Sequence, residues 1–137
     1  MPEQAAGYCE IEHTADWELH IWAPDMPALL EQAARGMFAL SHTQLAETPQ
    51  TALDFEIPYF DCESLLVDFL NELLFLAEEQ NLAPEQYQLN LGRTNLKVSL
   101  AAAPILSQAK EIKAVTYHRL QVREAENGLE VNIVFDV

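Results

Sequence analysis

Apolar and polar residues alternate in three short stretches of the first half of the chain, with the period of two that is typical of a strand with one buried face. The first stretch covers residues 8–12, and the second resumes the alternation at residues 17–21. Between them lies His-Thr-Ala-Asp at residues 13–16, which we interpret as a bend or loop that joins two pieces of strand. The third stretch, residues 51–59, predicts another strand.

Two longer segments repeat apolar residues at the spacing of one helix face. The first begins after Asp25, a residue type that caps helices, carries Pro27 in its first turn, and ends near Ser41. The second follows another capping residue, Asp61. Its apolar stripe consists of Leu65, Leu66, Phe69, Leu70, Leu73 and Leu74. The polar residues 43–50, which follow the first of these segments, predict a loop.

The second half of the chain, after Pro84, consists of strand patterns. They cover residues 86–92, 95–103, 112–118, 119–124 and 129–136. Asn127-Gly128 is a strong signal for a hairpin turn between the last two. The order β-α-β-α followed by a run of strands predicts an α+β fold, with both helices packed on one face of a largely antiparallel β-sheet. The length of the chain fits a single domain that spans residues 1–137.

Charge is the most unusual feature of the composition, because seven Lys and Arg residues stand against 22 Asp and Glu residues, a net charge of −15. Binding to a nucleic acid backbone depends on Lys and Arg side chains that displace counterions from the phosphates. Direct nucleic acid binding is therefore not expected, and a role in RNA metabolism would act through a basic protein. The same charge attracts divalent cations and speeds encounters with positive surfaces, although a need for solubility also accounts for it.

We expect a cytoplasmic protein that does not enter a membrane. The N-terminus lacks the basic stretch and apolar run of a signal peptide. The most apolar segment, residues 65–76, is interrupted by charged and amide side chains. Cys9 and Cys62 form no close pair in the sequence, so we interpret both as reduced thiols.

Carboxylates near the two ends of the chain are candidate metal ligands. Asp16 ends the segment at residues 13–16, Asp136 is the penultimate residue, and Val137 carries the terminal carboxylate. If the C-terminus docks on the protein, these groups offer the hard oxygens that Ca²⁺, Mg²⁺ or Mn²⁺ bind. Sequence spacing alone does not bring Asp16 and Asp136 together. The alternatives are a turn in which Asp16 bonds its own backbone, and a last strand that frays.

Besides the two ends of the chain, the segment of residues 111–119 is a candidate binding site. It would contact a nucleotide or an acidic partner; the alternative is that it is simply an exposed strand face. Alternation predicts that one of its faces carries Lys113, Val115, Tyr117 and Arg119. The other face would carry His118. The sequence contains no Gly-rich phosphate loop, zinc-ligand spacing or Gly-x-Ser-x-Gly motif, and no signature supports Cys9 with a histidine as a nucleophile pair. We therefore expect a protein that is not an enzyme and has no catalytic residues.

Five segments, in their order and spacing, resemble the archease family. They are residues 8–16, 33–37, 65–76, 112–118 and 135–137. The resemblance spans almost the whole chain, from Tyr8 to Val137, and its joint occurrence is specific although each segment alone is weak. Phe69 departs from the pattern, since the family usually carries Trp there.

The resemblance implies a protein cofactor of the RtcB-type RNA ligase, which joins 2′,3′-cyclic-phosphate or 3′-phosphate ends to 5′-hydroxyl ends in tRNA splicing. Members of the family speed the transfer of GMP onto the active-site histidine of the ligase and allow its repeated turnover. Such ligases need Mn²⁺. Carried over by position, Asp16, Asp136 and the terminal Val137 would hold a divalent metal ion (Ca, Mg or Mn).

Three other functions stay open on the sequence alone. A metal-independent, chaperone-like interaction module would act through an exposed apolar patch. A metal-dependent hydrolase would use Asp16 and Asp136 without a partner. A nucleic-acid mimic would use the negative charge and would need neither of these carboxylates.

Overall fold

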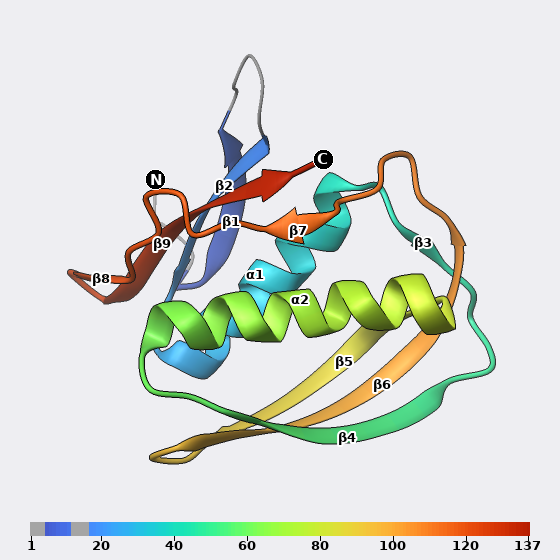
Figure 1. Cartoon of the computed structure of the whole chain (residues 1–137), viewed down its shortest axis with the longest axis horizontal. Helices are drawn as coiled ribbons and strands as arrows, with labels where there is room; N and C mark the ends of the chain where they lie inside the picture. Colours follow the sequence, from blue (N-terminus) through green and yellow to red (C-terminus); the bar gives the residue numbers. More distant parts are fainter. Residues whose placement is uncertain (1–4, 12–16) are drawn as a thin grey trace.

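The computed structural model describes residues 5–11 and 17–137 of the chain. Its helices and strands, in chain order, are β1 (Gly7–Ile11), β2 (Trp17–Ala23), α1 (Met26–Leu40), β3 (Gln44–Leu45), β4 (Thr51–Pro58), α2 (Cys62–Gln80), β5 (Leu82–Leu91), β6 (Asn95–Ser107), β7 (Ala114–Val115), β8 (Arg123–Ala125) and β9 (Gly128–Asp136). Figure 1 shows the C-terminal strand β9 beside β2, although the two are far apart in sequence.

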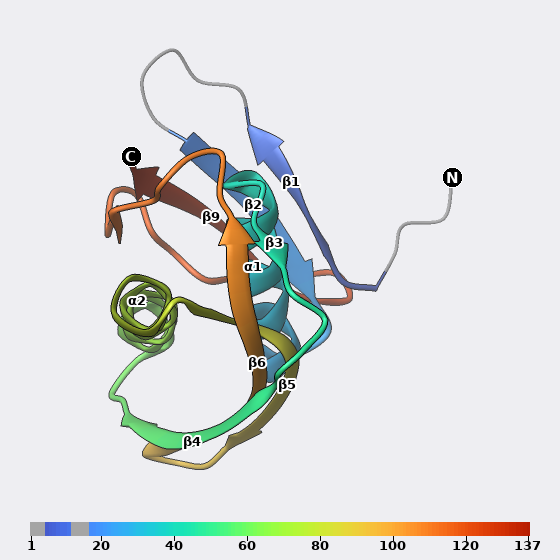
Figure 2. The same cartoon turned by 90° about the vertical axis from the view of Figure 1, so that its right-hand side faces the viewer.

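The strands form two antiparallel sheets, and the two helices lie between them (Figure 2). In the first sheet the strand order is β1-β2-β9-β7, and β8 pairs with β9 as well. In the second sheet β6 pairs with β3, β4 and β5. Helix α1 packs against β2 of the first sheet and β5 of the second, while α2 packs against β7 and, on its other side, against β4 and β5. The α+β class is confirmed, with the strands divided between two sheets.

Both predicted helices are confirmed, including their capping residues. The Oδ1 atom of Asp25 accepts a hydrogen bond from the Ala28 N–H at 2.9 Å, and that of Asp61 accepts one from the Ser64 N–H at 2.7 Å. Hydrogen bonding from the Ser64 backbone N–H is the main reason why the pKa of Asp61 lies below its usual value. Asn81 ends α2 in the left-handed conformation, with φ of 56°.

Helix α1 is apolar around most of its circumference, which explains why one sheet does not suffice to cover it. Ala33, Ala34 and Met37 are all fully buried. At Gly36, an added Cβ would lie 2.9 Å from both Leu19 Cδ1 and Tyr8 Cγ, so glycine permits the close approach of the first sheet. A helix with so wide an apolar surface requires cover from more than one side, and the second sheet provides it, while Glu31 and Arg35 keep a narrow polar face in solvent.

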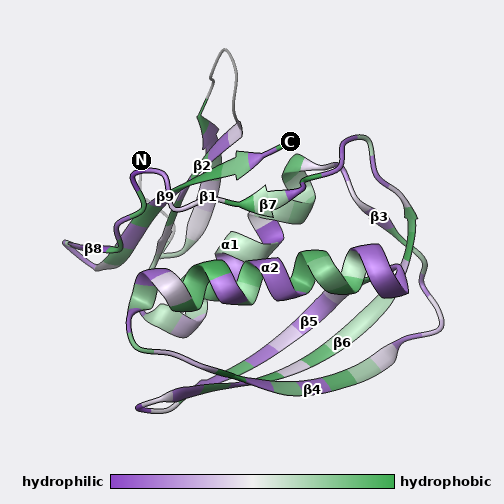
Figure 3. Ribbon diagram, in the orientation of Figure 1, coloured by the Kyte–Doolittle hydropathy of each residue, from purple (hydrophilic) through white to green (hydrophobic). Residues whose placement is uncertain are grey.

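Helix α2 keeps one face in solvent. Asp68, Glu72, Phe75, Glu78 and Glu79 are exposed on it. Figure 3 shows this alternation of hydrophilic and apolar residues along the helix. Within the described part of the chain, neither helix is long and apolar enough to span a membrane.

The strands of the second half follow the prediction in part. The strand expected at residues 86–92 begins earlier, at Leu82, and passes Pro84 with a register shift before Gln86. The segments at 112–118 and 119–124 contribute only the short strands β7 and β8. The hairpin between β8 and β9 is confirmed, and Gly128 begins β9 directly after its turn with φ of 149°.

Candidate functional site

The C-terminus is docked on the protein rather than frayed. Phe135 is fully buried, and Val137 packs half-buried against the core. Asp136 pairs with Ala114 of β7, and its carbonyl oxygen accepts a hydrogen bond from the Lys113 N–H at 2.8 Å. The side chain of Asp136 is exposed. An exposed carboxylate therefore stands on a strand whose backbone is fixed, one residue from the terminal carboxylate.

Strand β7, which holds this end of β9, is itself held from two sides. The Val115 N–H donates a hydrogen bond to Asn71 Oδ1 on α2 at 3.1 Å. The backbone N–H and the hydroxyl of Thr116 both donate to the Val134 carbonyl oxygen, each at 3.0 Å. Helix α2 thus fixes the short strand that borders Asp136.

Asp16, the third ligand predicted from the sequence, lies outside the described residues. Trp17, which follows it in the chain, pairs across the sheet with Phe135, which precedes Asp136. Among residues 5–11 and 17–137, no three His, Cys, Asp or Glu side chains are grouped closely enough to hold a metal ion. The described donors, the carboxylates of Asp136 and Val137, have the oxygen chemistry that suits Ca²⁺, Mg²⁺ or Mn²⁺.

The basic segment at residues 111–119 does not form the predicted alternating strand. Val115 is buried, whereas Tyr117 is 57% exposed, so the expected common face of Lys113, Val115, Tyr117 and Arg119 is wrong. Pairing with β9 stops after β7, and the chain turns, with the Leu120 N–H donating to the Tyr117 carbonyl oxygen at 3.1 Å. Burial, with a further contribution from nearby carboxylates, raises the pKa of Tyr117.

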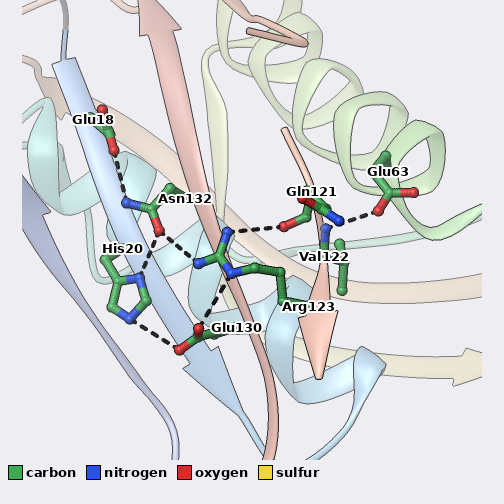
Figure 4. A network of polar contacts seen from close by, with 8 residues as sticks. All are labelled: Glu18, His20, Glu63, Gln121, Val122, Arg123, Glu130 and Asn132. Carbon is green, nitrogen blue, oxygen red and sulfur yellow. Dashed lines mark hydrogen bonds and ion pairs between the residues drawn. The ribbon is translucent and has the colours of Figure 1, made fainter. Parts of the chain in front are cut away.

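A polar network on the outer face of the first sheet was not predicted from the sequence (Figure 4). Asn132 of β9 lies at its centre, 2.9 Å from His20 Nδ1, and its amide donates to Glu18 Oε2 at 2.8 Å. Arg123 of β8 donates to Asn132 Oδ1 at 3.1 Å and to Glu130 at 3.3 Å. These residues come together on one face only because of the register in which three strands pair. The network can therefore be recognised only once that pairing is known, and no local sequence pattern predicts it.

This network gives the histidine a structural role rather than a catalytic one. Cys9 of β1 pairs with His20 in the ladder and is exposed. The two imidazole nitrogens, however, are directed to Asn132 and, at 3.8 Å, to Glu130. Neither therefore has the contact with the thiol that a nucleophile pair requires. Cys62 is also a free thiol, and burial raises its pKa.

Two hollows flank α2. One, of about 780 Å³, lies at its N-terminus and is bordered by Asp61, Glu63 and Tyr117. The other, of about 560 Å³, lies between the C-terminal half of α2, the end of β6 and the segment that leads into β7, and we call it the α2–β7 groove. Because Lys113 and Ala114 line it, this groove borders the docked C-terminus.

Comparison with known proteins agrees with this fold over nearly the whole chain. A sequence model of the Archease protein family matches residues 8–137. The protein archease of Methanosarcina barkeri is 30% identical over 100% of both chains, and that of Danio rerio is 31% identical over 95% of this chain and 85% of its own. A crystal structure from Thermotoga maritima, described as an archease and possible chaperone, has a TM-score of 0.71 at 27% identity, covering 93% of this chain and 94% of that one.

Proposed function

Because the chain belongs to the archease family, we propose that it is an accessory protein that activates an RtcB-type RNA ligase. In this role it promotes the metal- and GTP-dependent guanylylation of the ligase and its repeated turnover. The observation that carries the proposal is the pair of carboxylates, from Asp136 and the C-terminus, at the fixed end of β9.

The proposed ligands are Asp136, the terminal carboxylate of Val137, and Asp16. A divalent cation bound there would neutralise phosphate charge, which with positioning is most of what nucleotidyl and phosphoryl transfer require. The protein supplies position: pairing with β2 and β7 fixes the backbone of Asp136, while its side chain remains open to a partner. Little conformational entropy is then lost when this end of β9, with its carboxylates, enters the active site of the partner.

Net charge supports a protein partner. With 22 acidic against seven basic residues, the surface repels nucleic acid and is attracted to the basic surface that an RNA-joining enzyme presents to its substrate. Such attraction raises association rates at low ionic strength and loses strength as salt screens it.

The test is GMP loading of the cognate ligase from labelled GTP at limiting Mn²⁺, with and without this protein. Wild-type protein should increase loading, and Asp136→Asn should reduce the increase by at least about tenfold, since even the loss of a group that only supports a metal ligand costs roughly 10–100-fold. Asp54→Asn is the matched control, because it makes the same change on an exposed position of β4. Equal stimulation by Asp136→Asn and the control would remove the metal role, and no stimulation by wild-type protein would refute the ligase role.

A second candidate is a metal-independent, chaperone-like module. It is favoured by the exposure of Phe60, Phe75 and Leu106, which are 102%, 53% and 69% exposed, and by the description of the Thermotoga maritima relative as a possible chaperone. Suppression of aggregation of a heat-denatured client protein, unchanged by Asp136→Asn and by chelator, would support this candidate over the first.

A further inference from the structure

The α2–β7 groove has apolar side chains on both of its rims. Phe75 of α2 is 53% exposed on one rim, and Leu106 near the end of β6 is 69% exposed on the other. Ile112, on the segment that leads into β7, contributes a buried side chain to the lining. Large apolar side chains that are exposed at one hollow leave apolar area that a partner can remove from water.

Three polar side chains that line the groove are already paired within the chain. The Ser41 hydroxyl donates to the Phe38 carbonyl oxygen at 3.1 Å, and the Asn81 amide donates to the Ile105 carbonyl oxygen at 3.0 Å. Asn71 Oδ1 accepts the Val115 N–H at 3.1 Å. These three side chains are therefore occupied, and what the groove offers an occupant is mainly apolar contact and charged side chains.

The charges around the groove select a basic occupant. Helix α2, which forms one wall, carries five acidic residues and no Lys or Arg. Glu78 and Glu111 stand at the groove with Lys113 as the basic residue among its lining. A second copy of the chain, which carries a net charge of −15, would be repelled, whereas a segment with Lys or Arg beside an apolar side chain complements the groove.

We propose that the α2–β7 groove docks a basic segment of the ligase, with an apolar side chain held between Phe75 and Leu106 and cationic side chains facing Glu78 and Glu111. The proposal rests on the function proposed above and adds the surface by which the partner is held. Since Ala114 lines the groove and pairs with Asp136, a segment bound there lies next to the C-terminal carboxylates. Docking in the groove would then deliver those carboxylates to the site at which the ligase is loaded.

The test is the dependence of ligase GMP loading on the concentration of this protein, compared between wild-type protein and the double variant Phe75→Ser/Leu106→Ser. The variant should raise the half-saturating concentration by about tenfold or more, as truncation of a central apolar anchor does, and should leave the maximum loading unchanged. Phe60→Ser is the matched control, because Phe60 is 102% exposed and precedes the opposite end of α2, roughly 20 Å from Phe75 along the helix. Both substituted side chains are exposed, so the variants are expected to fold, and circular dichroism checks this.

The outcomes separate failure of the groove from failure of the ligase role. A raised half-saturating concentration with an unchanged maximum supports the groove, and an unchanged half-saturating concentration overturns it while the ligase role stands. No stimulation by wild-type protein overturns both. A second pair of variants tests whether the occupant of the groove is basic. Glu78→Gln/Glu111→Gln removes two negative charges from the groove, and Asp54→Asn/Glu56→Gln removes as much charge from β4. At low salt the groove variant should raise the half-saturating concentration severalfold more than the β4 variant, and equal effects would refute the proposal that the occupant is basic.

Discussion

Replacement of Asn71 by Ala tests whether α2 fixes the strand that borders the C-terminal carboxylates. Asn71 Oδ1 accepts the backbone N–H of Val115 at 3.1 Å, and Val115 is only 5% exposed. The substitution removes the acceptor and leaves that N–H in a site with little access to water. Since Val115 pairs with Phe135, a weakened β7 also loosens the last residues of β9.

The magnitude follows from two contributions. A buried donor left without its partner costs about 1–3 kcal/mol. Ala is a better helix former than Asn, which returns roughly 0.5 kcal/mol in the interior of α2. The net loss of stability is therefore about 0.5–2.5 kcal/mol. With an unfolding entropy of about 2.1 cal/mol/K per residue, a chain of 137 residues should lose roughly 2–9 °C in Tm.

Urea denaturation gives the stability, and amide hydrogen exchange gives the location. The Val115 amide should exchange faster in Asn71→Ala than in the wild-type protein, by more than the global loss of stability accounts for. Glu72→Ala is the control, because it lies next on the same helix with its side chain exposed, and it should change stability by no more than about 0.5 kcal/mol. Unchanged protection of Val115 in Asn71→Ala would refute the view that this hydrogen bond fixes β7.

Three further changes test the fold. Gly128→Ala should destabilise by more than about 2 kcal/mol in urea, because φ is 149° and the added Cβ would overlap the Ala23 carbonyl oxygen. The Ser64 N–H holds the pKa of Asp61 below its ordinary value in the unfolded chain, so this carboxylate stabilises the fold above that ordinary pKa, and the stabilisation is lost as pH falls through the lower folded pKa. The stability difference between Asp61→Ala and wild-type protein, measured by urea denaturation from pH 7 to 3, should therefore narrow in acid. Asn132→Ala should cost about 1–3 kcal/mol, because it removes the hydrogen bonds that Asn132 makes with Glu18, His20 and Arg123 in a half-buried network, and a thermal melt with no shift would contradict this.

The helices were predictable because local rules determine them. A capping Asp, followed by apolar residues at helical spacing, is visible in the sequence at both Asp25 and Asp61, and both caps form. Strands β1 and β2, as separate pieces, and the β8–β9 hairpin also follow from short-range alternation and turn residues. The docking of the C-terminus was left open by the sequence, and it follows from the burial of Phe135 in the structure.

Features that depend on distant pairing were not predictable. The alternation of residues 112–118 predicts a long strand, but only two residues pair with β9, because Val115 is anchored to Asn71 and the chain then turns away. The network around Asn132 requires the register of β2 with β9, which no local pattern specifies. The division of the strands into two sheets goes with the wide buried surface of α1, a property of packing rather than of strand propensity.

The α2–β7 groove and the C-terminal carboxylates of Asp136 and Val137 are supported by the same helix. Helix α2 forms a wall of the groove through Phe75 and, one turn earlier, holds β7 through Asn71. Strand β7 in turn pairs with Asp136. A partner that binds Phe75 therefore contacts the same helix that positions the terminal strand, so that binding and presentation of the carboxylates depend on one rigid unit. Under the proposed function, a single docking event would supply both affinity and alignment, which is the arrangement that an accessory protein needs if it is to act on another enzyme's active site.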